Sequence, residues 1–178
     1  TPDIIKDLVR SENRFVRTPQ EAPFQVIFPD IPPSELEVER FGVFQFITDV
    51  EKHISVIEGE DLSDRNTDSS SHVEVMVGLD SAMIFGYSPG QEFFLQPTRG
   101  KNRSPIPVRV AGIIDAKDIE DEYWLGHYDM FYIAGDEVND IPPKATFFVT
   151  EEAFFDDIGN RAPGILADYW RFLYINPE

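Results

Sequence analysis

The sequence predicts an α+β fold, in which short strands are mixed with a few short helices. Apolar residues alternate with other residues over 73–77 and again over 106–110, which is the period of a strand. Near residues 80 and 150, a capping residue precedes a short apolar stretch, as at the start of a helix. Turn residues separate many of the segments, so that several strands are expected to form hairpins.

The stretch "VEVMVGLDSAMIFGYSPGQEFFLQP" (73–97) shows the pattern most fully. Its alternating valines predict a strand. Asp80 can cap a short apolar helix, and Gly86 can adopt the left-handed conformation that ends one. The sequence Ser88-Pro89-Gly90 predicts a tight turn, after which a second strand begins at Glu92. The stretch connects elements and carries no chemistry of its own.

The remaining elements follow from the same signals. Helices are predicted over 2–9, over 35–53 and over 153–158, the last one capped by Thr150. The 35–53 helix rests on apolar residues at helical spacing, and Gly42 favours a start near Arg40. Residues 61–72 and 115–122 are predicted loops, and 123–134 is aromatic-rich and extended in part. Further strands are expected over 24–28, 54–57, 92–96, 106–114, 145–149 and 167–175.

Composition and charge narrow the classes of function. The 178 residues, 42% of them hydrophobic and 15 of them Phe, are enough for a packed interior. The net charge of −18 argues against binding to nucleic acids or to anionic lipid. Acidic residues outnumber basic ones by ten to two over 30–64 and nine to one over 115–140, whereas 65–114 is nearly neutral. These two acidic blocks are interpreted as solvated faces, with a surface for cationic partners or metal ions as the alternative.

Catalytic and metal-binding motifs are scarce. With no cysteine, the chain has no disulfide, thiolate ligand or cysteine nucleophile. His53, His72 and His127 lack the spacing of a ligand set, and each is interpreted as structural. No nucleophile elbow or glycine-rich phosphate loop is present. The sequence therefore predicts neither an enzyme nor a bound cofactor, although a hydrolase that uses carboxylates stays open.

The run "DAKDIEDEYW" (115–124) is the one candidate for a metal. Asp115, Asp118 and Asp121 share a single loop and could offer oxygen ligands to Ca²⁺. The run lacks the glycine and the distal Glu of an EF-hand loop. Its alternative interpretation is a solvated acidic turn ahead of a buried Tyr123-Trp124 anchor.

Three segments, in order, resemble the MacB-type periplasmic core domain, which is the extracytoplasmic domain of FtsX-like ABC transporter permeases. They are "HISVIEGEDL" (53–62), "VEVMVGLDSAMIFGYSPGQEFFL" (73–95) and "VRVAGIIDAKDIEDEYW" (108–124). The segments "TFFVTEEAFF" and "ADYWRFLYINP" also resemble steps of that domain. The matches cover residues 41–177. Gln91 stands where an acidic residue is usual, and the first forty residues match little.

The resemblance implies a two-lobed domain, one lobe inserted in the other. Residues 1–52 and 145–178 would form a membrane-proximal lobe, and residues 53–144 an inserted, mainly β lobe. Transmembrane helices would flank the chain, which would lie on the extracytoplasmic face of the membrane. Its implied partners are those permease helices, a separate ATPase subunit or domain, and a protein, lipoprotein or peptide substrate. A dimer in the full transporter and a non-catalytic coupling role are also implied.

A stand-alone barrel-like module of the double-psi or swapped-hairpin type is the alternative. The spacing of Ala82, Gly86, Gly90 and Leu95 also occurs in such barrels, where a helix and a turn connect strands in the same way. For contact with a partner, the predicted residues are the aromatic side chains Tyr87, Tyr128 and Phe131, together with the acidic loop 115–122.

Overall fold

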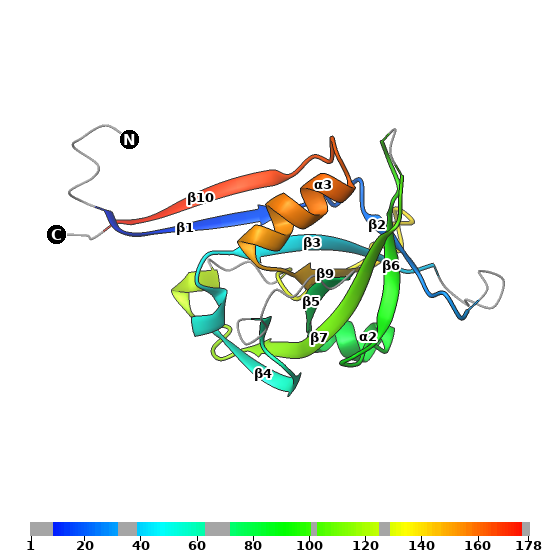
Figure 1. Ribbon diagram of the computed structural model, residues 1–178. Coiled ribbons are helices and arrows are strands. Elements are labelled where there is room, and N and C mark those ends of the chain that lie inside the picture. Colours follow the sequence, from blue (N-terminus) through cyan, green and yellow to red (C-terminus); the bar gives the residue numbers. More distant parts are fainter. Residues whose placement is uncertain (1–8, 32–38, 63–71, 101–102, 125–128, 176–178) are drawn as a thin grey trace.

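The computed structural model describes residues 9–31, 39–62, 72–100, 103–124 and 129–175, and most of their regular structure is strand (Figure 1). The strands are β1 (Val9–Arg17), β2 (Phe24–Ile27), β3 (Phe41–Ile47), β4 (Ile54–Gly59), β5 (Val73–Gly78), β6 (Glu92–Pro97), β7 (Ile106–Ala116), β8 (Tyr132–Ile133), β9 (Lys144–Phe148) and β10 (Asp168–Ile175). The helical segments are the 3₁₀ turns η2 (Val50–Lys52) and η4 (Glu122–Trp124), the α-helix α2 (Leu79–Phe85), the π-helical η5 (Ala153–Ile158) and its continuation α3 (Gly159–Arg161).

Six strands form a closed β-barrel. Its strand order is β3, β2, β6, β7, β5 and β9, and β9 pairs with β3 to close the ring. The β3–β9 and β5–β7 pairs are parallel, whereas the four other pairs of the ring are antiparallel. Closure gives every strand of the ring a neighbour on both sides, so none of the six presents an open edge.

The predicted two-lobed α+β architecture is wrong. Strands from both predicted lobes share the barrel: β3 and nearly all of β9 come from 1–52 and 145–178, and β5, β6 and β7 come from 53–144. The parallel pairing joins Phe41 to Lys144 and Gln45 to Phe148 across a large sequence separation. Turn signals report only neighbouring strands, and they therefore could not reveal this closure.

The helix predicted over 35–53 is also wrong where the structure describes it, because Phe41–Ile47 is the strand β3. Apolar side chains occupy both faces of this strand, with Phe44 in one core and Ile47 in another, so a two-residue period is hidden. Gly42 is part of the strand: a Cβ added there would lie 2.2 Å from Cε2 of Phe147. Residues 32–38, and all of the predicted 2–9 helix except Val9, lie outside the described residues.

The wall of the barrel separates two hydrophobic cores. The interior core lies inside the ring and includes Phe24, Phe44, Phe93, Leu95 and Phe147. The outer core lies against the outside of the wall and includes Met76, Ile114, Trp124, Met130, Phe131 and Phe148. Strand β9 contributes side chains to both cores, since Phe147 faces inward and its neighbour Phe148 faces outward.

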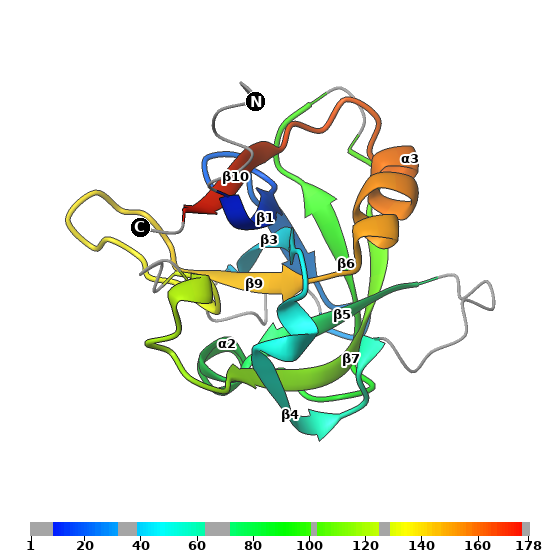
Figure 2. The ribbon, with the colours of Figure 1, turned by 90° about the vertical axis from the view of Figure 1, so that its left-hand side faces the viewer.

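Strands β1 and β10 form a two-stranded ribbon that projects from the barrel and brings the two described chain ends together. Val9 pairs with Ile175, but β1 joins β3 only over residues 15–17. Figure 2 shows the ribbon pointing toward the viewer. Phe15 stacks on Trp170 with ring centroids 4.9 Å apart, and this contact helps to hold β10 on β1.

The strand–helix–turn–strand prediction for 73–97 is confirmed by β5, α2 and β6. Gly86 ends α2 in the left-handed region, at φ 71°. The turn closes through the Gln91 N–H, which donates to the Ser88 carbonyl. Gly78 rather than Asp80 is the N-cap. None of the helices in the part of the chain that the structure describes has the length and apolar character to cross a bilayer.

Candidate functional site

The acidic loop does not gather its aspartates around a common point. Asp115 Oδ1 accepts the Ala116 N–H, and Asp118 Oδ1 accepts the Glu120 N–H. Asp121 instead turns toward His53. Among the described residues, no three His, Asp or Glu side chains come together as a metal site. Asp115 and Asp118 therefore bond to the backbone of their own loop, whereas Asp121 bonds to His53, and the Ca²⁺ site stays a prediction.

His53 and Asp121 fasten the acidic loop to the barrel. Their side chains share a 2.7 Å hydrogen bond, and the His53 ring stacks on Tyr123 with centroids 3.7 Å apart. The Tyr123 backbone N–H and the His53 side chain hold the pKa of Asp121 below its usual range. Because Tyr123 Oη donates to the Thr48 carbonyl, the described contacts place no hydroxyl nucleophile beside His53. The arrangement anchors a loop.

The predicted aromatic contact patch is wrong for two of its three residues. Tyr87 is 5% exposed and packs among Phe85, Phe93 and Phe147 in the interior core. Phe131 is 6% exposed and packs in the outer core. Burial also raises the pKa of the Tyr87 hydroxyl. Tyr128 lies outside the described residues.

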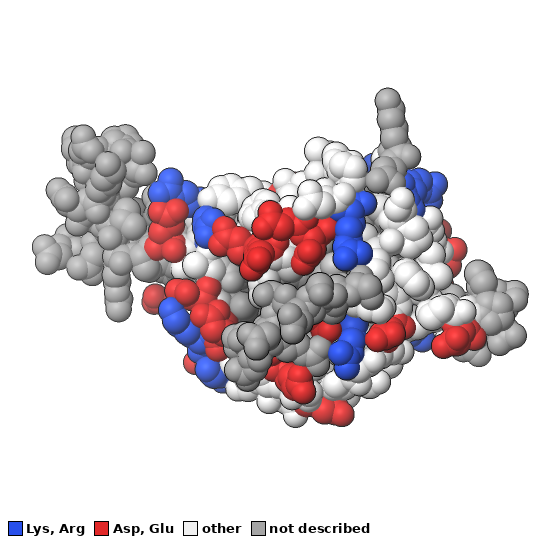
Figure 3. Space-filling view, viewed as in Figure 1, with Lys and Arg blue, Asp and Glu red and all other residues white. Residues whose placement is uncertain are grey.

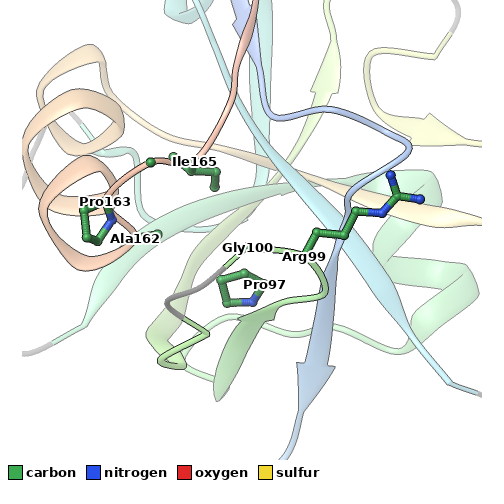
Figure 4. Close-up of a pocket in the computed structure, with 7 residues that line it drawn as sticks. Pro97, Arg99, Gly100, Ala162, Pro163 and Ile165 are labelled. Atoms are coloured by element: carbon green, nitrogen blue, oxygen red, sulfur yellow. The ribbon is translucent and has the colours of Figure 1, made fainter.

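A pocket of about 250 Å³ lies where the β6–β7 hairpin meets the loop after α3, as seen in Figure 4. Its lining consists of Pro97, Arg99, Gly100, Ala162, Pro163, Gly164 and Ile165. Figure 4 shows the Arg99 side chain extending away from Pro163 and from the other labelled residues, so the guanidinium points outward from the pocket. The pocket thus combines apolar walls with a cationic edge.

Hydrogen bonds fix both walls of the pocket. The 162–165 wall is a β-turn, in which the Ile165 N–H donates to the Ala162 carbonyl and Gly164 has φ 84°. This proline–glycine pair has the geometry that a type II turn requires. On the hairpin, both the backbone N–H and the hydroxyl of Thr98 donate to the Pro23 carbonyl. The pocket is therefore formed before any ligand arrives.

Charge around the pocket differs from that of the rest of the molecule. Residues 97–111 and 158–167 contain no Asp or Glu, and they carry five of the chain's 15 Lys and Arg residues. By contrast, Figure 3 shows acidic side chains gathered over the helical segment of η5 and α3, where Glu152, Asp156 and Asp157 are exposed. The pocket is a cationic region of a strongly acidic surface.

The pocket offers recognition chemistry. Its lining has no carboxylate, imidazole or hydroxyl, and so no group that could transfer a proton near neutral pH. Apolar walls and one guanidinium can hold an apolar group beside an anion. This site was not predicted, although the near-neutral middle of the chain and the "APGI" turn (162–165) were visible signals in the sequence.

A scan against protein-family models finds no match for this chain, and a search of curated proteins finds none either. The relationship to the permease domain stays a prediction that rests on the motifs quoted above.

Proposed function

We propose that this chain is a non-catalytic binding module built on a closed barrel. The observation that carries the proposal is the pocket between the β6–β7 hairpin and the 162–165 turn, with its apolar walls, its cationic rim and no acid–base group in its lining. A rigid barrel with binding loops at its margin is a common basis for recognition. This function corresponds to the barrel-like module that the spacing of Ala82, Gly86, Gly90 and Leu95 left open.

The extracytoplasmic side of an ABC permease is the setting that we propose for this module. The ordered motifs of residues 41–177 support it. The ribbon supports it as well, because β1 and β10 bring the described chain ends side by side at one end of the molecule. A domain whose ends lie close together can be carried between two segments of a longer chain without distortion.

Photo-crosslinking in intact cells tests the binding function. A photoreactive phenylalanine analogue replaces Leu166, which is 74% exposed and adjoins the pocket residue Ile165. The matched control carries the same analogue at Val138, which is 93% exposed on a different loop. The Leu166 variant is expected to give a discrete adduct that the Val138 variant does not give. Equal adducts at both positions, or no adduct at either, would contradict the proposed binding function.

The membrane setting has its own test. Since the chain contains no cysteine, Val138→Cys adds a single reactive thiol to this domain. In the natural gene product that carries this sequence, a membrane-impermeant maleimide is expected to label Val138→Cys in intact cells more strongly than it labels the unsubstituted protein. Labelling that requires lysis of the cells would contradict the extracytoplasmic setting and would leave the binding function standing.

A further inference from the structure

The proposed binding function does not specify the chemistry of the ligand, but the features of the pocket limit which ligands fit. We infer that the pocket takes one apolar side chain of an extended acidic peptide segment, whose neighbouring carboxylate pairs with Arg99. This inference rests on the proposed function and names the partner class of the same site. Three observations support it: the size of the pocket, the charge around it and the rigidity of its walls.

Size favours a single side chain over a whole cofactor. The pocket holds about 250 Å³. Sites for drug-sized ligands and cofactors usually span roughly 300–1,000 Å³, and they bury most of the ligand. A cavity below that range accepts one aromatic or aliphatic group and leaves the rest of the ligand on the surface. Peptides bind in this way when a single anchor residue enters a pocket.

Charge favours an acidic ligand. Arg99 lies at the rim and forms no ion pair with a described residue, while Arg161 precedes the 162–165 turn. The two segments that line the pocket contain no carboxylate, although the chain as a whole carries a net charge of −18. An acidic peptide is repelled by most of this surface and attracted here, so the same charge pattern selects the site and orients the ligand.

Rigid pocket walls allow a peptide to bind through a single anchor side chain. Thr98 is hydrogen-bonded to Pro23, and the Gln96 side-chain amide donates to the Arg103 carbonyl across the hairpin. Pro97 and Pro163 place two conformationally restricted residues in the opposing walls. Because these walls are already ordered, binding does not cost the entropy of ordering them.

The test measures peptide binding to the purified 178-residue chain at low ionic strength, where exposed charges are least screened. The probe is the dye-labelled peptide Ser-Glu-Phe-Glu-Ser, followed by fluorescence anisotropy. Two matched peptides replace either both Glu residues by Lys or the Phe by Ser. The acidic Phe peptide is expected to bind at least about tenfold more tightly than either one, a difference that a lost anchor or a reversed charge produces.

Three substitutions locate the site. Arg99→Glu is expected to weaken the acidic Phe peptide about tenfold, whereas Lys52→Glu, with the same charge change on η2, should stay within about twofold. Arg99→Lys is expected to keep most of the affinity. The backbone amide NMR signals of Gly164 and Ile165 should shift on titration with the peptide. Thermal unfolding of each variant confirms that it is folded.

Three outcomes overturn the inference. They are equal binding of the acidic and basic peptides, equal weakening by Arg99→Glu and Lys52→Glu, and binding of free phenylacetate as tight as that of the peptide. The last outcome would assign the pocket to a small aromatic acid. If Leu166 crosslinks a partner in cells while the peptide fails to bind, the binding function stands and the acidic-peptide chemistry is wrong.

Discussion

The interior and outer cores are built from similar side chains but are closed in different ways. The interior core is enclosed by six strands whose ladder returns on itself. The outer core is covered by β4, by η4 and by residues around Met130 and Phe131. In the described part of 117–133, the two-residue strand β8 is the only strand paired to the barrel. The interior core is therefore enclosed by a continuous hydrogen-bonded sheet, whereas the outer core is covered by residues held largely through single side-chain hydrogen bonds.

Those attachments are mostly single side-chain hydrogen bonds. His53 bonds to Asp121, and Tyr123 Oη donates to the Thr48 carbonyl. The side chains of Gln45 and Ser81 donate to the carbonyls of Met130 and Phe131. The covering segment can separate from the barrel without breaking the β3–β9 closure. We therefore expect the inner core to set the global stability and the outer core to open locally.

The largest effect is expected from Phe147→Ala, in the interior core. Phe147 is 0% exposed and contacts the rings of Phe44, Tyr87 and Phe93. Its truncation leaves a cavity that the closed wall cannot collapse to fill, so we expect a loss of about 3–5 kcal/mol in the free energy of unfolding. Urea denaturation measures this loss. The control Phe155→Ala, at 52% exposure, should cost much less, and equal losses would contradict the comparison.

A smaller and more local effect is expected from Trp124→Ala, in the outer core. The side chain is 1% exposed, but the segment that carries it can relax. We expect a loss of about 3 kcal/mol in the free energy of unfolding, at the low end for a buried aromatic residue. Hydrogen exchange distinguishes local from global opening. The Lys117 amide, bonded to the His53 carbonyl, should exchange faster, while the Val149 amide, bonded to the Gln45 carbonyl, should change little. Equal acceleration at both amides would show that the two cores open together.

The smallest effect is expected from Asp121→Asn, which tests the attachment by pH. The pKa of Asp121 is lowered in the folded state, so its carboxylate stabilises the fold above its unfolded pKa. That contribution is lost as the pH falls through the folded value. At neutral pH we expect the variant to be less stable by about 0.5 kcal/mol, since the group is partly exposed and screened. Unfolding curves of the two proteins should converge in acid, and parallel curves would contradict the assignment.

Local parts of the fold could be predicted from the sequence, and its closure could not. The β5–α2–β6 unit was predictable because alternating valines, Gly86 and the Ser88-Pro89-Gly90 turn act over a few residues. Strand β3 was not, since burial of both faces erases the period of two. Strand β1 reads "VRSENRFVR", and its polar residues hide a strand that only the pairing with β10 reveals.

The candidate site shows the same division. The turn at 162–165 and the basic hairpin were each visible in the sequence. The contact between the two segments could not be predicted, because they lie about sixty residues apart in the sequence and only the folded barrel brings them together. Tyr87 and Phe131 were predicted as exposed contact residues but are buried. An aromatic residue in the sequence indicates a large apolar side chain, but it does not indicate whether that side chain faces the core or the solvent.

The parallel β3–β9 pair determines when the barrel can close during synthesis of the chain. Phe41 meets Lys144 only after the residues between them have left the ribosome. At roughly 5–20 residues per second, this interval is on the order of 5–20 seconds. During that interval the apolar strand β3 has no β9 to pair with, so the barrel closes only after β9 has emerged. Folding is then governed by a late, long-range contact, as is usual for slow β-proteins, and the nascent chain is most exposed to aggregation just before β9 emerges.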